Sequence, residues 1–167
     1  MAWSDTYKVI DARKIVSNLF TYFQTNQADA LLWAHGSALK DFKQFADSVA
    51  NRATPAFPSI AFKRDSTKWD ATGDVVETEY SVVFEMVIEN PSPTLAVSQG
   101  RSYAKAVASM ILNCPTATLL ANTGAVTGVV TEMADNFTEI KSNDTQNDFF
   151  QEIEIGATFS LVTGLHT

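Results

Sequence analysis

The sequence predicts an α+β protein with a single, mostly antiparallel sheet of about four strands and helices packed on one face. Residues 95–112 repeat their apolar side chains at helical spacing, whereas residues 80–88 and 149–161 alternate apolar and polar side chains as strands do. The chain has 167 residues, enough to bury a core without a metal or disulfide. We expect the element order α-α-β-β-α-β-β in one domain, residues 1–167.

Two helices are expected in the first third of the chain. The first, over residues 7–23, carries an apolar stripe formed by Ile15, Leu19 and Phe23. The second, over residues 37–52, repeats the stripe more weakly, and prolines shortly after it prevent its continuation.

Two strands should follow, separated by a loop. Residues 57–64 form a short apolar run, and residues 65–74 are polar and rich in turn formers, which predicts a projecting loop. Residues 77–89 then alternate, with an apolar face that begins at Tyr80 and ends at Ile88. The opposite face of this strand should be mixed and acidic.

The rest of the chain predicts one more helix and a strand hairpin. Residues 95–112 are rich in alanine, which suits close packing on a sheet, and Pro115 prevents the helix from continuing. Residues 126–140 are rich in valine and threonine, and residues 149–161 alternate clearly. The polar segment 143–148 supplies a turn between these two strands.

Charge is distributed unevenly along the chain. The net charge is −7, which argues against a general grip on nucleic acid, because such a grip needs many lysines and arginines. Residues 1–70 carry nine basic and seven acidic side chains, whereas residues 71–167 carry three and twelve. The acidic second part is either ordinary solubilising charge or an electrostatic surface with a task.

The sequence contains no signal peptide pattern, no apolar run long enough to cross a membrane, and one cysteine, Cys114. We therefore expect a protein made in the cytoplasm, without a disulfide and without membrane contact.

Residues that could carry out chemistry are few. The two histidines, His35 and His166, cannot build a metal cluster or a convincing catalytic triad. The segments 37–40 and 102–105 match the pattern S-x-x-K, but no companion motif accompanies either. Cys114 has no basic sequence neighbour that would activate it. We expect no catalytic site, no cofactor and no metal.

The order of the elements resembles that of the tail terminator proteins of tailed bacteriophages. The likeness rests on an amphipathic first helix, the strand 58–63 between prolines and a polar loop, the long strand 77–89, the alanine-rich segment 101–112 and a closing pair of strands. It covers nearly the whole chain.

The resemblance implies a structural protein of the virion at the head–tail junction. Members of the family form a homohexameric ring that caps the tail tube, ends its polymerisation and joins it to the head-side connector or stopper protein. DNA would meet such a ring only in transit through its channel.

Two groups of residues are candidates for contacts in such a ring. An acidic strand face could line the channel, where like charge would keep DNA from adhering, or could lie on the outside of the ring. This face comprises Glu77, Glu79, Glu85, Glu89, Glu152 and Glu154. The expected loop 63–74 should contact an adjacent subunit or the tail tube, because basic and aromatic side chains often anchor interfaces. Its contact residues are Lys63, Arg64, Lys68 and Trp69.

Two other functions remain open. One is a different component of the phage neck, a connector or a stopper, since residues 28–52 are longer and more helical than a tail terminator would suggest. The other is a small cytosolic α+β protein that binds a ligand or acts as an enzyme. A ring with a central hole favours an assembly protein, and a stable monomer with one deep polar pocket favours the last alternative.

Overall fold

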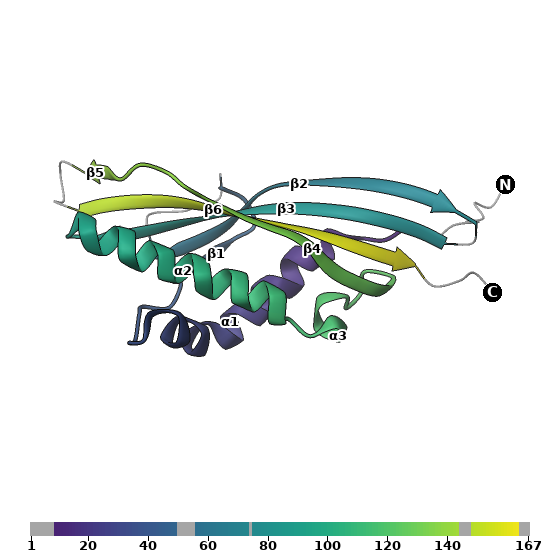
Figure 1. Ribbon diagram of the computed structural model, residues 1–167, viewed down its shortest axis with the longest axis horizontal. Helices are drawn as coiled ribbons and strands as arrows, with labels where there is room; N and C mark the ends of the chain where they lie inside the picture. Colours follow the sequence, from purple (N-terminus) through teal and green to yellow (C-terminus); the bar gives the residue numbers. More distant parts are fainter. Residues whose placement is uncertain (1–8, 50–55, 74, 144–147, 164–167) are drawn as a thin grey trace.

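The computed structural model describes residues 9–49, 56–73, 75–143 and 148–163. It shows one long, twisted sheet with the helices gathered on one of its faces (Figure 1). The helices are α1 (Lys14–His35), α2 (Pro93–Asn113) and α3 (Thr116–Leu119). The strands are β1 (Gln44–Ala46), β2 (Ser59–Thr72), β3 (Val75–Asn90), β4 (Ala125–Phe137), β5 (Lys141–Asn143) and β6 (Asp148–Thr163).

The sheet has six strands in the order β1-β2-β3-β6-β4, with β5 paired to β6. The prediction of about four mostly antiparallel strands in the order α-α-β-β-α-β-β is therefore wrong. The sheet is mixed, because β1 runs parallel to β2, and the elements follow the order α-β-β-β-α-α-β-β-β. Both additional strands have three residues, too few to produce an alternating pattern that a sequence reader could find.

The predicted second helix is wrong over its described part. Residues 37–43 form no helix or strand, and β1 follows them. The side chain of Gln27 explains this locally, because its oxygen accepts a 2.8 Å hydrogen bond from the backbone nitrogen of Phe42. The first helix begins at Lys14 and continues to His35, beyond the predicted end. Residues 7–8 and 50–52 of the two predicted helices lie outside the described residues.

The predicted loop 63–74 is a strand as far as residue 72. Here β2 pairs antiparallel with β3 along its whole length, so that Trp69 is the partner of Thr78. Gly73 begins the turn with a φ of 64°, a backbone conformation that glycine adopts without steric cost. Residue 74 lies outside the described residues. The segment forms a strand because β3 provides hydrogen-bond partners, although its own side chains are polar.

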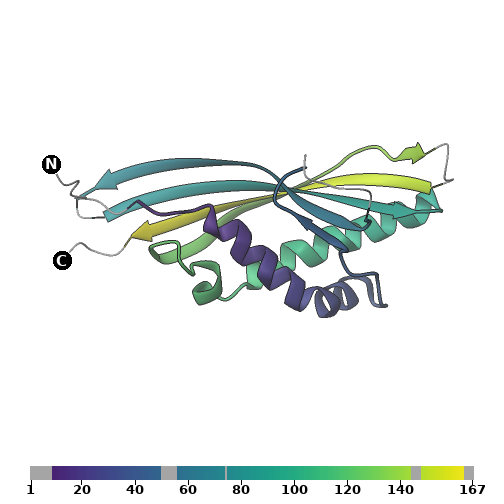
Figure 2. The same cartoon turned by 180° about the vertical axis from the view of Figure 1, so that it is seen from behind.

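Helix α2 packs against both the sheet and α1. Ser92 precedes it with a capping hydroxyl that accepts from the backbone nitrogen of Leu95, and Pro93 occupies the first turn. The small residues Ala96 and Gly100 are buried, and the missing side chain at Gly100 lets the helix approach Gln151 and Ile153 of β6 closely. Figure 2 shows α1 beside α2 on the same side of the sheet. None of the described helices combines the length and the apolar character that crossing a membrane requires.

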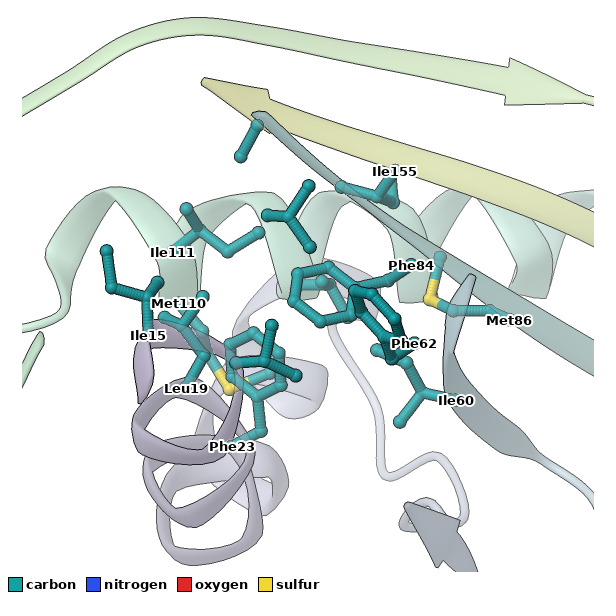
Figure 3. Packing of buried hydrophobic residues seen from close by; sticks show 14 of the residues in the cluster. Ile15, Leu19, Phe23, Ile60, Phe62, Phe84, Met86, Met110, Ile111 and Ile155 are labelled. Atoms are coloured by element: carbon teal, nitrogen blue, oxygen red, sulfur yellow. The ribbon is translucent and has the colours of Figure 1, made fainter. Parts of the chain in front are cut away.

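The core lies between the helices and the sheet (Figure 3). Phe84 from β3 is fully buried, and its ring centroid lies 5.4 Å from that of Phe20 and 6.1 Å from that of Phe23. The predicted apolar faces are confirmed for both long strands. In β3 the buried set includes Tyr80, Val82, Phe84, Met86 and Ile88, and in β6 it includes Ile153, Ile155, Ala157, Phe159 and Leu161.

Candidate assembly surfaces

The polar face is the face of the sheet opposite the helices. Cross-strand pairing makes Glu85 of β3 and Glu154 of β6 direct partners there, whereas Glu152 is the partner of Val87. Exposure varies strongly along this face, because Glu77 and Glu79 are exposed whereas Glu85 is only 6% exposed. The face is therefore not a uniform row of solvated carboxylates.

A cluster of four charged residues lies at the centre of the polar face. The Lys63 ammonium lies 2.6 Å from Glu85 Oε2 and 2.5 Å from Glu154 Oε1. The Arg64 guanidinium lies 3.7 Å from the other oxygen of Glu154. Hydrogen bonds to Glu154 and then to Glu85 raise the pKa of Lys63 above its usual value, so the lysine is charged across the neutral range. The cluster compensates the buried Glu85 carboxylate, which would otherwise be costly to desolvate.

A bulge in β2 makes this cluster possible. The register between β2 and β3 shifts between Phe62 and Arg64, so Lys63 is an additional residue in the strand. A bulge changes the direction in which the neighbouring side chains point. As a result Lys63 and Arg64 both reach carboxylates on the polar face, while Phe62 stays in the core.

The end of the polar face near the β2–β3 turn is hollowed. The hollow has a volume of about 320 Å³. It is lined by Lys68, Asp70, Glu77, Thr78, Glu79, Thr131 and Ser160. Lys68 is the cross-strand partner of Glu79, and Glu77 lines the same hollow. Acidic and basic side chains are thus interleaved at this end too.

Glu152 and Glu89 lie toward the opposite end of the sheet. Glu152 Oε1 accepts a 3.3 Å hydrogen bond from the Lys141 ammonium of β5. Partial burial raises the pKa of Glu89 above its usual 4.5, a hydrogen bond with Asp148 raises it further, and Lys43 and Lys40 act in the opposite direction. Two carboxyl groups that share a hydrogen bond favour retention of a proton between them.

Trp69 is separate from the ion cluster. It lies on the outer part of β2, pairs with Thr78, and is 56% exposed. Its strand parity matches Asp65, whose carboxylate accepts a 2.9 Å hydrogen bond from Tyr80. Trp69 therefore faces the helix side of the sheet, whereas Lys68 faces the polar side.

The motifs considered for chemistry have structural roles. His35 Nδ1 lies 2.9 Å from Ser102 Oγ, and this contact joins α1 to α2. Lys105 does not join that pair, because its ammonium lies 4.2 Å above the Trp33 ring. Burial raises the pKa of Cys114 to about 11, which keeps its thiol protonated and unreactive. His166 lies outside the described residues.

The backbone oxygen of Lys40 accepts a hydrogen bond from the hydroxyl of Tyr103. Within the described ranges no three histidine, cysteine or acidic side chains are placed to hold a metal ion.

The sequence analysis missed the exposed apolar residues of β4. Val126 and Val129 are 60% and 61% exposed on this outermost strand. The valines themselves were visible in the sequence, but their exposure follows from the position of β4 at the sheet edge, which local pattern does not indicate. A second exposed apolar group lies on the helices and includes Leu32, Trp33 and Leu112.

The geometry defines a sheet with helices on one face and an ion-paired polar face on the other. Comparison with protein-family models and with curated protein sequences gives no match. Among solved structures, the chain is similar to one from the virion of a native gene transfer agent particle. The identity is 15% and the TM-score 0.43, over 86% of this chain and 92% of that chain.

Proposed function

We propose that this chain is a structural subunit of a phage-like virion and that it acts as a tail terminator. Copies of one domain, residues 1–167, would form a homohexameric ring that caps the tail tube and ends its polymerisation. The ring would join the tube to the head-side connector or stopper protein, at the head–tail junction. This role needs no catalytic group or cofactor.

One observation carries the proposal: the sheet is covered by helices on one face only, and its opposite face is polar and fixed by ion pairs. A buried carboxylate such as Glu85 is usually held by a compensating partner, and here Lys63 of β2 contacts both Glu85 of β3 and Glu154 of the adjacent β6. The result is a broad face of the sheet on which acidic and basic side chains alternate. A face of this kind suits contact with other macromolecules or with a water-filled channel better than binding of a small ligand.

We further propose that the polar face lines the channel of the ring. The exposed carboxylates Glu77 and Glu79 would then repel DNA in transit, whereas Glu85 and Glu154 would serve to fix the strands. This placement gives two of the predicted glutamates a repelling role and two a structural role. The alternative, with the polar face outside the ring, predicts no effect of Glu77 or Glu79 on DNA.

The outer part of β2, residues 63–72, is proposed as a contact with an adjacent subunit or the tail tube. Arg64, Lys68 and Trp69 are exposed there, and the strand extends far beyond its only described pairing with β1 at Ser59–Ala61. Exposed aromatic and basic side chains on a rigid strand are suited to anchor an interface.

Negative-stain imaging of the purified protein, alone and mixed with its tail tube protein, tests the proposed function. We expect rings with a central hole, and tubes that bear one ring at an end and cease to grow. A protein that stays monomeric under both conditions contradicts the proposal. Rings that neither bind nor stop tubes would assign the chain to another neck component.

A further inference from the structure

Both long edges of the sheet lack a partner among the described residues. Strand β1 covers only Ser59–Ala61 of β2, which leaves residues 62–72 without a neighbour on their outer side. Strand β4 is the last strand on the opposite side, and its pairing partner is β6 alone. Open edges present rows of backbone donors and acceptors that can pair with another strand. Proteins commonly shield such edges or make them short, whereas these two are long.

The directions of the two edge strands allow one copy to join the next. Successive pairs β2–β3, β3–β6 and β6–β4 are all antiparallel, so β2 and β4 run in opposite directions. If a second copy is generated by rotation about an axis parallel to the strands, each of its strands keeps the direction that it has in the first copy. The β2 edge of one copy would therefore meet the β4 edge of the next as an antiparallel pair. A contact between two different surfaces of identical subunits generates a ring when the rotation closes.

On the polar side, the two edges carry opposite charges. On the polar side of β2, Lys68 is exposed between Arg64 and Asp70. On the same side of β4, Glu132 is exposed and pairs with Thr158 of β6. A lysine directly across from a glutamate stabilises an antiparallel strand pair, and like charges at these places destabilise it.

The helix side of the same edges is complementary in shape. Trp69 projects on the helix side of β2 and is largely exposed. Between β4 and α2 lies a groove of about 200 Å³, lined by Ala108, Met133, Ala134, Asp135 and Ile155. If Lys68 lies opposite Glu132, then Trp69 is a diagonal neighbour of Met133, a distance that an aromatic side chain reaches.

We propose that residues 62–72 of one copy extend the sheet of a second copy by pairing with β4, with Lys68 beside Glu132 and Trp69 in the groove next to Met133. The inference rests on the proposed ring and names its subunit interface. The sheet then continues from one subunit to the next around the channel. The exposed Val129 of β4 lies within the paired stretch.

Charge reversal tests the interface. Lys68→Glu and Glu132→Lys should each convert rings to monomers, as measured by light scattering during gel filtration, and the double variant should restore rings. Trp69→Ala should lower the ring fraction as well. Arg101→Glu, an exposed charge reversal on α2, is the matched control and should leave rings intact. Thermal unfolding of each monomer checks that the variants fold.

Amide hydrogen exchange provides an independent measurement on the wild-type protein. Residues 62–72 and 128–137 should exchange more slowly in the ring than in the monomer formed by Lys68→Glu. Rings that persist in all three interface variants, or a double reversal that fails to restore them, overturn the inferred interface while the ring itself stands. A wild-type protein that stays monomeric with and without the tube protein overturns the proposed function and the interface together.

Discussion

Lys63 Nζ lies 2.6 Å from Glu85 Oε2, although 22 residues separate the two in sequence. The contact exists because β2 and β3 pair across the bulge at Lys63, and it compensates a carboxylate that is almost completely buried. Lys63→Met should lower the free energy of unfolding by about 1–3 kcal/mol, because it removes the charged hydrogen-bond donor of that carboxylate on β2. Urea unfolding measures the change.

The double variant Lys63→Met/Glu85→Gln should recover part of this loss, since it removes the buried charge as well. Lys141→Met is the matched control, because its partner Glu152 is much more exposed, and it should cost less than about 1 kcal/mol. Equal effects of the two lysine substitutions would contradict a structural role for the Lys63 cluster.

Deprotonation of Glu89 should make the protein less stable as pH rises. Its pKa is raised in the folded state by burial and by Asp148, so the folded protein binds more protons than the unfolded chain just above pH 4.5. Stability should therefore fall as pH increases through this window and stay lower above the folded-state pKa. Glu89→Gln should flatten the decline, as measured by the midpoint of thermal unfolding between acid and neutral pH. Glu139→Gln, at an exposed position, should keep the wild-type profile.

Phe84 should be essential for the core. Its fully buried ring contacts Phe20 and Phe23, so Phe84→Ala should reduce the free energy of unfolding by about 3–5 kcal/mol. Phe84→Asp should prevent folding, because the carboxylate would enter the core. Phe137→Ala, at a partly exposed position on β4, should cost much less. Circular dichroism during denaturation distinguishes these outcomes, and a native-like Phe84→Asp protein would contradict the observed packing.

Glu77 and Glu79 should control adhesion of DNA to the ring. The variant Glu77→Lys/Glu79→Lys should still assemble but should retain DNA, and the retention should weaken as salt rises, because it is electrostatic. Filter binding at several salt concentrations measures this. Asp29→Lys, an exposed charge reversal on α1, should not retain DNA if the helices lie outside the channel. Retention by Asp29→Lys alone would place the helix side toward DNA.

Ser102 and Lys105, which match the S-x-x-K pattern, should have no catalytic role. His35 and Ser102 form a contact between helices, and Lys105 lies over Trp33. Lys105→Ala should therefore leave ring formation and tube capping at wild-type levels in the imaging assay. Loss of capping by a folded Lys105→Ala protein would contradict this assignment.

Local pattern was sufficient wherever one element provides its own signal. The alternation around Phe84 in β3 and around Phe159 in β6 identified the buried faces, because successive side chains of a strand point to opposite sides. The apolar spacing and flanking prolines of residues 95–112 identified α2 within two residues at its start and one at its end. These features depend only on neighbouring residues.

The tertiary structure decided the features that depend on distant partners. Residues 65–72 form a strand because β3 provides their hydrogen-bond partners. Residues 37–43 are not helical, and the backbone nitrogen of Phe42 donates its hydrogen bond to the side chain of Gln27 on α1. The same holds for the candidate surface. The sequence by itself determined which glutamates share a strand face, but only the pairing of β2, β3 and β6 decided that Lys63 lies between Glu85 and Glu154, because that contact joins three strands.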